Sequence, residues 1–367
     1  MGWVHMDGKE RDVILQTRNI FIRFQLTHQS AKSAKLALGA VTCVAMGSML
    51  AKVVNSTFLH KLQALPAHQI ADYDTAMTKI AHIQAFEKTL KLQGECHTTV
   101  LTHGYKTEQV IILMHGMTSC PLQFVEFGTL LFQEGYNVLI PRMPYNGYTD
   151  LDTTALRSLT MKDLRDCSAT MIDIAHGLGE HVTYAGLSVG GTMAAWVAQY
   201  RADVDRAILI APAFTIDRHL GASVSKLVMY LLYLLPNLMT QRFRHGHGSP
   251  FGYRGFATRS LAVMMRLGFT VYEAARKVKP AVQSVLVITN AADPSMNNGI
   301  IQSLVQRWQK RGLRYCEVYE FEAQHHLPHD IIGTQNPHQH VAFVYPILLA
   351  LITRKQHRDD VDQQGQG

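Results

Sequence analysis

The sequence VTYAGLSVGG, residues 182–191, decides the fold. Its first four residues have the pattern of a buried strand, and a helical pattern then runs on to Tyr200. Gly186 and Gly190 lack Cβ atoms, so the backbone can turn sharply here and neighbouring chains can pass close. The stretch predicts a strand, a tight turn and a helix; an ordinary glycine-rich turn is the alternative. Ser188 then lies exposed at a helix N-terminus, where the dipole and the free amides favour negative charge.

Strands and helices alternate on both sides of this turn, from about residue 96 to residue 353. Several strand-like runs are apolar throughout, as expected of strands covered on both faces. The alternation predicts an α/β fold with a mostly parallel, doubly wound sheet. The predicted strands are residues 96–102, 110–114, 137–140, 182–185, 207–210, 284–289 and 315–321, and the predicted helices are residues 122–134, 161–177, 189–200, 297–310 and 341–353.

One stretch, from residue 213 to residue 280, breaks the alternation and shows no convincing strand. It holds an apolar run at residues 227–235 and then a loop rich in Gly, His and Pro at residues 245–255. We expect a helical insertion over about residues 214–280 that caps the sheet. The apolar run is too short to span a bilayer, so a cap helix is the prediction and a lid that dips into a membrane is the alternative.

A second motif, His115-Gly116-Met117-Thr118, directly follows the predicted strand at residues 110–114. Acyl transfer creates an oxyanion that needs positioned hydrogen-bond donors. A glycine-containing loop after an early strand can present one backbone N–H, and the residue after a nucleophile can present another. We expect the oxyanion hole to use the amides of Met117 and Val189, and we expect His115 to order the loop rather than act as a base.

Candidates for an acid and a base follow Ser188 along the chain. Asp293 lies just past a predicted strand, where a carboxylate can orient a histidine; capping of the next helix is its alternative role. His325, His326 and His329 follow the last predicted strand. Three close histidines also permit a metal site, but no compact set of Asp, Glu or Cys accompanies them at zinc spacing. The order Ser, Asp, His suits a catalytic triad, and spacing alone does not select the base.

Composition limits the other function classes. The 367 residues carry a formal net charge of +7, and 47% of them are hydrophobic, which is enough for a globular core. The basic residues are scattered, with no run interleaved with aromatics and no zinc-finger motif, so we expect no nucleic-acid partner. The five cysteines form no CxxC pair and no disulfide framework. An exported domain could form one disulfide, and the sequence does not say which.

The first 60 residues predict a basic leader with a membrane anchor or signal segment. Residues 36–51 carry no charge, and their length lies between those of a signal h-region and a transmembrane helix. Basic residues before them favour a cytoplasmic N-terminus. We expect a hydrophobic, uncleaved anchor helix and a catalytic domain outside the cytoplasm, in the periplasm of a bacterium; a secreted protein with a cleaved signal and a buried helix are the alternatives. Residues 61–95 predict a connecting helix packed on the domain, and residues 354–367 predict a polar tail.

These motifs resemble those of the α/β-hydrolase superfamily, in particular bacterial carboxylesterases and monoacylglycerol-lipase-like serine hydrolases. The resemblance covers roughly residues 96–353 and rests on the segments HGMTSCP, GLSVGG, TNAADPSMNN and HHLPHD. Relatives carry their catalytic histidine in a run similar to LPHD, which implies His329 as the base and leaves His325 and His326 in reserve. The stretch at residues 141–147 departs from the family, because YNG stands where relatives often have Gly-His-Gly, in a loop that usually borders the pocket.

The resemblance implies a hydrolase that cleaves carboxylic esters through an acyl-enzyme on Ser188, with His329 as base and Asp293 behind it. No cofactor and no metal is required. The apolar cap suggests a small-molecule substrate with an apolar part, such as a short- to medium-chain ester or a monoglyceride. The same triad would serve an acyltransferase or a thioesterase. A non-catalytic, membrane-tethered binding protein on a hydrolase scaffold is the alternative from another class.

Overall fold

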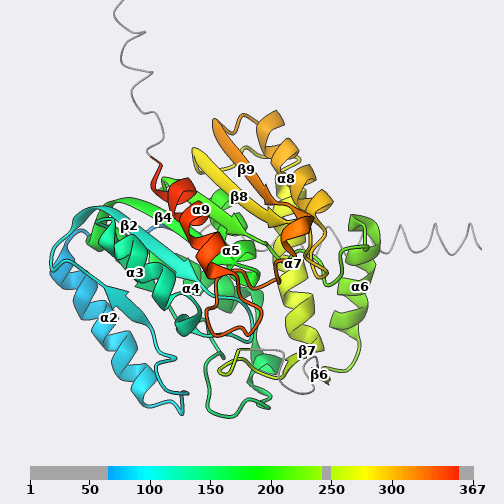
Figure 1. Ribbon diagram of the computed structural model, residues 1–367, viewed down its shortest axis with the longest axis horizontal. Helices are drawn as coiled ribbons and strands as arrows, with labels where there is room; N and C mark the ends of the chain where they lie inside the picture. Colours follow the sequence, from blue (N-terminus) through cyan, green and yellow to red (C-terminus); the bar gives the residue numbers. More distant parts are fainter. Residues whose placement is uncertain (1–64, 242–248, 355–367) are drawn as a thin grey trace, which may run out of the picture. The chain divides into compact units, whose positions relative to one another are not determined.

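The computed structural model of the chain describes residues 65–241 and 249–354. Its main sheet has seven strands: β1 (Thr99–Leu101), β2 (Thr107–Met114), β3 (Asn137–Ile140), β4 (Gly179–Leu187), β5 (Arg206–Ile210), β8 (Ser284–Asn290) and β9 (Tyr315–Phe321). The strand order is β1-β3-β2-β4-β5-β8-β9 (Figure 1). All pairs are parallel except β1, which runs antiparallel to β3 at one edge. The mostly parallel α/β sheet that the sequence predicts is confirmed.

Helices cover both faces of this sheet, as a doubly wound fold requires. They are α2 (Tyr73–Lys88), α3 (Val125–Gln133), α4 (Met161–Leu178), α5 (Val189–Tyr200), α6 (Ala222–Leu234), α7 (Thr258–Ala274), α8 (Asn298–Lys310) and α9 (Val341–Thr353). Val110, Ile112 and Met114 of β2 belong to the core that also contains residues of α2, α4, α5, α7 and α8. Ile111 and Leu113 belong to the core under α3 and α9 (Figure 1). Since β2 is buried on both faces, its sequence is apolar without alternation.

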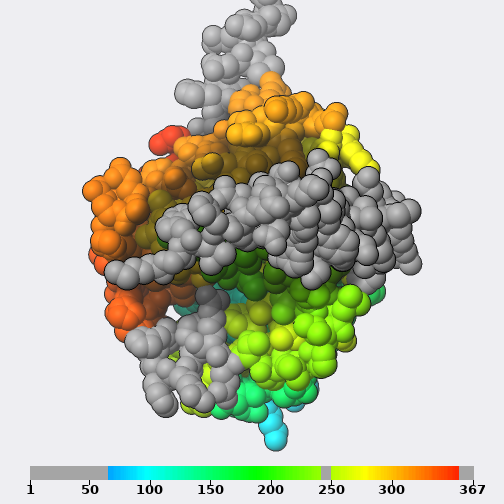
Figure 2. Space-filling model, turned by 90° about the vertical axis from the view of Figure 1, so that its right-hand side faces the viewer, coloured from blue at the N-terminus to red at the C-terminus, as the bar shows by residue number. Residues whose placement is uncertain are grey.

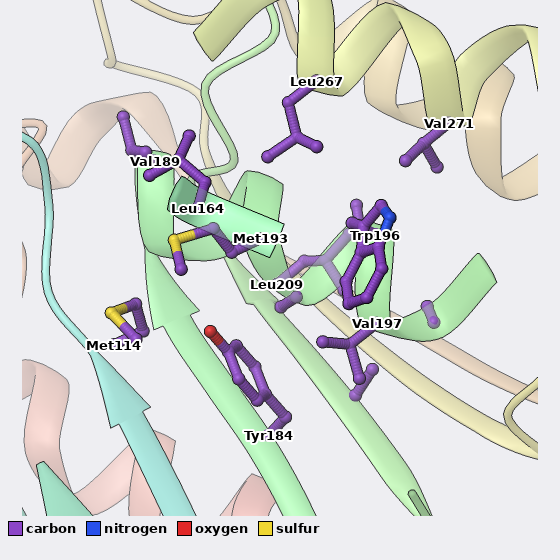
Figure 3. Close-up of a cluster of buried hydrophobic side chains, with 14 of the residues drawn as sticks. Met114, Leu164, Tyr184, Val189, Met193, Trp196, Val197, Leu209, Leu267 and Val271 are labelled. Atoms are coloured by element: carbon purple, nitrogen blue, oxygen red, sulfur yellow. The ribbon is translucent and has the colours of Figure 1, made fainter. Parts of the chain in front are cut away.

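The larger core is centred on α5, the helix that follows the Ser188 turn. Met193 and Trp196 of α5 lie between Tyr184 of the sheet and Leu267 and Val271 of α7 (Figure 3). Almost the whole of α5 is buried in this way. The N-terminus of the helix is therefore held from the sheet side and from the cap side.

The insertion between β5 and β8 contains α6, α7 and a short two-stranded antiparallel sheet. Its strands are β6 (Met239–Gln241) and β7 (Gly255–Ala257), and Met239 pairs with Ala257. The sequence predicts no strand between residues 213 and 280, and this is wrong for these two. The reason is their length, because three residues are too few to show a strand's alternating pattern.

The two cap helices differ in how they are covered. Helix α7 is buried along most of its length, and a Cβ on Gly268 would lie 2.8 Å from the Phe214 ring. Helix α6 packs on α7 through one side, with Met229 buried, and carries Leu227, Leu231 and other apolar side chains on its outer side. The light-green residues of this region form part of the outer surface of the molecule (Figure 2).

Helix α2 precedes the sheet and packs against α4. It begins after Asp72, whose side chain accepts the N–H of Thr75 at 2.8 Å, and it buries Ala76 and Ile80. Within the described residues, each helix is too short or too polar to cross a bilayer. The anchor or signal segment predicted at residues 36–51 lies outside the described residues.

Candidate active site

The predicted site residues follow the carboxyl ends of four strands. Ser188 comes directly after β4, Met117 lies shortly after β2, Asp293 shortly after β8, and His329 beyond β9. Because these strands are parallel, their carboxyl ends share one edge of the sheet, which is where ligands bind in open α/β folds.

Ser188 lies in a strained turn between β4 and α5. Its φ is 59° and its ψ is −114°, a region that residues with side chains rarely adopt. A Cβ on Gly186 would lie 2.3 Å from the Gly190 carbonyl, and a Cβ on Gly190 would lie 2.1 Å from the Met114 oxygen. The sharp turn and close approach that the two glycines predict are confirmed.

Backbone hydrogen bonds hold this strained turn in place. The Ser188 N–H donates to the Ile210 carbonyl at 2.9 Å, and the Ser188 carbonyl accepts the N–H groups of Thr192 at 2.9 Å and Ala213 at 3.1 Å. Ser188 is the N-cap of α5, yet its side chain makes no capping hydrogen bond. The hydroxyl is therefore not engaged by its own helix.

The loop after β2 runs beside the serine. A Cβ on Gly116 would lie 3.6 Å from the Cβ of Ser188. The Gly116 carbonyl accepts a hydrogen bond from His115 Nδ1 at 2.8 Å and another from the Ser119 N–H at 3.2 Å. A carbonyl and the N–H of the same trans peptide point in opposite directions, so these bonds fix the direction of the Met117 N–H.

His115 is locked through both ring nitrogens. Its Nε2 accepts the N–H of Met143 at 3.0 Å, which leaves the proton on Nδ1 for the Gly116 carbonyl. Burial, aided by the Arg142 charge and opposed by the bond to Gly116, lowers the pKa of this imidazole from 6.5 to about 4. A neutral ring with both nitrogens engaged orders the loop and is not free to act as a base.

Asp293 and His329 form a close pair. His329 Nδ1 lies 2.5 Å from Asp293 Oδ2, and the two side chains are 26% and 1% exposed. Burial raises the pKa of the Asp293 carboxyl, but the His329 charge and hydrogen bond and the amides of Ser295 and Met296 outweigh it, and the pKa lies below its usual value. The Ser295 N–H donates to Asp293 Oδ1 at 2.8 Å. An ionised carboxylate on Nδ1 leaves Nε2 of His329 to accept a proton.

The structure separates the three clustered histidines. The His325 ring packs on Phe343, with 4.5 Å between the ring centroids. His326 is exposed and has a φ of 47°. Neither of them lines the cavity beside Ser188, whereas His329 does. The geometry therefore favours His329 as the base over the two reserve candidates.

Ser188 and His329 face the same cavity without being bonded to each other. Both residues belong to the part of the chain that the structure describes, and the Ser188 hydroxyl makes no hydrogen bond to the His329 imidazole. In enzymes without substrate such bonds are often long, and they tighten when the substrate binds. Their shared cavity is where a substrate would bring the serine and the histidine together.

The cavity at this edge has a volume of about 1120 Å³. Ser188, His329, Met117 and Val189 all line it. The other lining residues include an apolar group, Ile216, Phe256, Leu261, Met264 and Met296, a polar group, Thr118, Ser119, Asp152, Ser249 and Arg254, and the pair Gln123 and Asp330. Arg254 forms an exposed ion pair with Asp152 at 2.7 Å. A cavity with both kinds of lining suits a ligand that has an apolar part and a polar part.

Asn290, at the end of β8, is a site residue that the sequence does not single out. Its Oδ1 accepts the Ala292 N–H at 2.9 Å, and its Nδ2 donates to the carbonyls of Leu327 at 2.9 Å and Pro328 at 3.1 Å. The buried amide thus ties the turn that carries Asp293 to the loop that carries the histidine. A polar residue at the end of an apolar strand is the signal that points to it.

Gln123 is a second site residue that the sequence analysis does not single out. No pattern in the residues around it points to its role. It lies in the short helical turn Pro121–Gln123, after the loop that holds Gly116. Its side chain bonds that loop on one side and Asp330, next to the histidine, on the other.

The loop at residues 141–147, which in relatives usually borders the pocket, contributes no residue to the lining of this cavity. It lies behind the oxyanion loop, where its backbone supports His115. Gly147 packs against a disulfide between Cys96 and Cys120, and a Cβ on Gly147 would lie 3.0 Å from the Cβ of Cys96. The disulfide that the sequence leaves unassigned is therefore this one.

Comparisons with known proteins agree with this architecture. The family described as serine aminopeptidase, S33, matches residues 105–330, a range that contains all the predicted site residues. No curated protein matches the sequence. The expected hydrolase class is confirmed by the family match.

Three solved structures resemble the chain in fold. A metagenome-derived lipolytic enzyme, from work on LipS and LipT, has 14% identity and a TM-score of 0.53 over 71% of this chain and 98% of its own. The monoacylglycerol lipase of Paleococcus ferrophilus has 15% identity and a TM-score of 0.53 over 71% and 99%. A soluble variant of the monoglyceride lipase of Saccharomyces cerevisiae has 14% identity and a TM-score of 0.51 over 70% and 89%. At these identities the likeness supports the α/β-hydrolase fold alone.

Proposed function

The chain belongs to the serine aminopeptidase S33 family, and from this premise we propose that it cleaves carboxylic esters through an acyl-enzyme on Ser188. The observation that carries the proposal is one cavity lined by a serine in a strained strand–helix turn and by a histidine bonded to a buried carboxylate. Metal-free acyl transfer needs a nucleophile, a base with its orienting acid, and an oxyanion hole. Each has a candidate at this edge.

In the first half of the proposed reaction, His329 Nε2 takes the proton of the Ser188 hydroxyl while the oxygen attacks the ester carbonyl. The Met117 and Val189 amides hold the oxyanion, and one such donor is worth about 10²–10³ in rate. The imidazolium then gives its proton to the departing alcohol. In the second half, water attacks the acyl-enzyme with His329 again as base, and the acid leaves.

For the substrate we propose a short- to medium-chain ester or a monoglyceride. The apolar lining from the cap and from Met296 suits an acyl chain, and the polar lining around Asp152 and Arg254 suits an alcohol with hydroxyl groups. Two of the structural neighbours are named as monoacylglycerol or monoglyceride lipases, which agrees with this choice.

Replacement of Ser188 by alanine tests the proposal. The purified wild-type chain should hydrolyse p-nitrophenyl butyrate and react with a fluorophosphonate probe. Ser188→Ala should lose both, with kcat reduced by about a million-fold. Ser223→Ala, at an exposed serine of α6, is the matched control and should behave as wild type. Turnover retained in Ser188→Ala would rule the mechanism out.

Graded substrates separate the proposed ester hydrolase from other uses of the same triad. The measurement is kcat/KM for esters of increasing acyl length, for thioesters and for amino-acid anilides. We expect the highest kcat/KM for the esters. Preference for thioesters would indicate a thioesterase, and product formed only with an added alcohol acceptor would indicate an acyltransferase. Preference for amino-acid anilides would indicate the aminopeptidase activity in the family's description.

We also propose that residues 36–51 anchor the protein, with the catalytic domain outside the cytoplasm. The support is the uncharged run with basic residues before it, and the Cys96–Cys120 disulfide, which suits an oxidising compartment. The protein should remain in the membrane fraction after an alkaline wash and be released by detergent. Recovery of a shortened chain in the medium would instead indicate a cleaved signal.

A further inference from the structure

We propose that Gln123 is a positioning residue that couples the oxyanion loop to the loop of the catalytic base; this inference rests on the function proposed above. The Gln123 side chain is buried, with 6% exposure. Its Oε1 accepts the Gly116 N–H at 2.8 Å, and its Nε2 donates to Asp330 Oδ2 at 2.7 Å. One side chain therefore touches two catalytic loops that come from opposite halves of the sequence.

The chemistry of its two partners requires an amide here. The Gly116 N–H can only donate a hydrogen bond, and the Asp330 carboxylate can only accept one. An amide side chain offers an acceptor and a donor without charge, so glutamine meets both needs in one orientation. A carboxylate at position 123 would face the Asp330 carboxylate, and a hydrocarbon there would leave the Gly116 N–H unpaired.

At one end, the amide completes the restraint of the oxyanion loop. The Gly116 carbonyl is held by His115 and Ser119, and Gln123 holds the N–H of the same residue. These two groups belong to the peptides before and after the Gly116 Cα, so both peptides are held, and the second of them carries the Met117 N–H. This donor has to be aimed at the position where the oxyanion forms.

At the other end, the amide holds the residue after the base. Asp330 Oδ2 accepts from Gln123, and Asp330 Oδ1 accepts the N–H groups of Ile332 at 3.1 Å and Gly333 at 2.8 Å. Asp330 thus closes the loop just past His329 and links it to the oxyanion loop. Misplacement of a catalytic group by about 1 Å can cost about 10² in rate, so loss of the link should lower kcat more than it raises KM.

An exchange of charge between the two positions tests the coupling on the full chain in detergent. Gln123→Glu sets two carboxylates against each other, and Asp330→Asn sets two amide donors against each other. The double variant Gln123→Glu/Asp330→Asn has the same atoms as the wild type with the donor and the acceptor exchanged. In it the carboxylate at position 123 accepts both the Gly116 N–H and the new amide at position 330.

We expect kcat to fall about 10- to 100-fold in Gln123→Glu and about 10-fold in Asp330→Asn, with KM changed less than threefold. The double variant should recover to within about threefold of wild type, as a coupled pair does. The decrease in kcat caused by Gln123→Glu should become smaller as the pH is lowered, because the two facing carboxyl groups then share a proton. The double variant should lack that extra pH dependence.

Endpoint labelling with a fluorophosphonate counts the folded sites, so each kcat is expressed per site. The proposal is overturned if Gln123→Glu keeps the wild-type kcat per site, if its whole loss is a loss of labelled sites, or if the double variant is no better than the single ones. A wild type that neither reacts with the probe nor hydrolyses esters would be a failure of the proposed function itself, which is a separate result.

Discussion

The carboxyl edge of the sheet and the cap insertion are built in opposite ways. At the edge, His115, Asn290 and Asp293 are buried polar residues that hydrogen bonds hold in place. In the cap, α6 turns apolar side chains outward, with Leu227 at 58% and Leu234 at 76% exposure. The edge thus fixes the positions of the candidate catalytic groups, whereas the cap lines the cavity through its inner side.

The edge should tolerate little change, and the largest effect is expected at the base. His329→Ala should lower kcat by about 10⁴-fold or more, because no other described histidine lines the cavity to take the serine proton. His325→Ala is the matched control from the same segment and should stay within about threefold, since its ring packs on Phe343. The measurement is kcat for p-nitrophenyl butyrate. The reverse order of the two variants would move the base to His325.

A second test concerns stability, through the neutral His115. The buried ring stays neutral down to a pKa of about 4, while in the unfolded chain it takes up a proton near pH 6.5. Its contribution to stability is therefore present above pH 6.5 and is lost as the pH falls toward 4. Between pH 7.5 and 4.5, urea unfolding should show a loss on the order of 2–3 kcal/mol in the wild type that His115→Asn does not share.

His82 provides the control for that pH dependence, because it is an exposed histidine of α2, far along the chain from His115. His82→Asn leaves the buried ring in place, so the difference between pH 7.5 and pH 4.5 should stay close to that of the wild type. Parallel pH curves for His115→Asn and the wild type would mean that the oxyanion loop does not depend on a neutral imidazole.

The same contrast explains how far the sequence can predict this molecule. The Ser188 turn can be predicted from the sequence because its cause is local: two glycines, an apolar strand and a helix lie within one short stretch. The strands are readable because burial on both faces makes each run apolar. Asp293 and His329 are readable as candidates from chain order, although their contact across β8 and β9 appears only in the fold.

The parts that could not be predicted depend on contacts between distant segments or on very short elements. Gln123, which follows β2, meets Asp330, which follows β9, and no local pattern near position 123 predicts this contact. The loop at residues 141–147 supports His115 instead of bordering the cavity, and its end packs on a disulfide between residues distant from it in the sequence. Strands β6 and β7 are too short to carry a periodic pattern.

The smallest effect is expected on the outer side of α6. Leu227→Gln should change the free energy of unfolding by less than about 0.5 kcal/mol, because the side chain is exposed and both residues favour helices similarly. The Met229 side chain, two residues further along the same helix, is 2% exposed. Met229→Ala should therefore lower the free energy of unfolding by about 2–5 kcal/mol. Both should keep kcat within a few fold, since neither side chain lines the cavity. A cost of 2 kcal/mol or more for Leu227→Gln would mean that the outer side of α6 is covered in solution, and the cap would then be built like the edge.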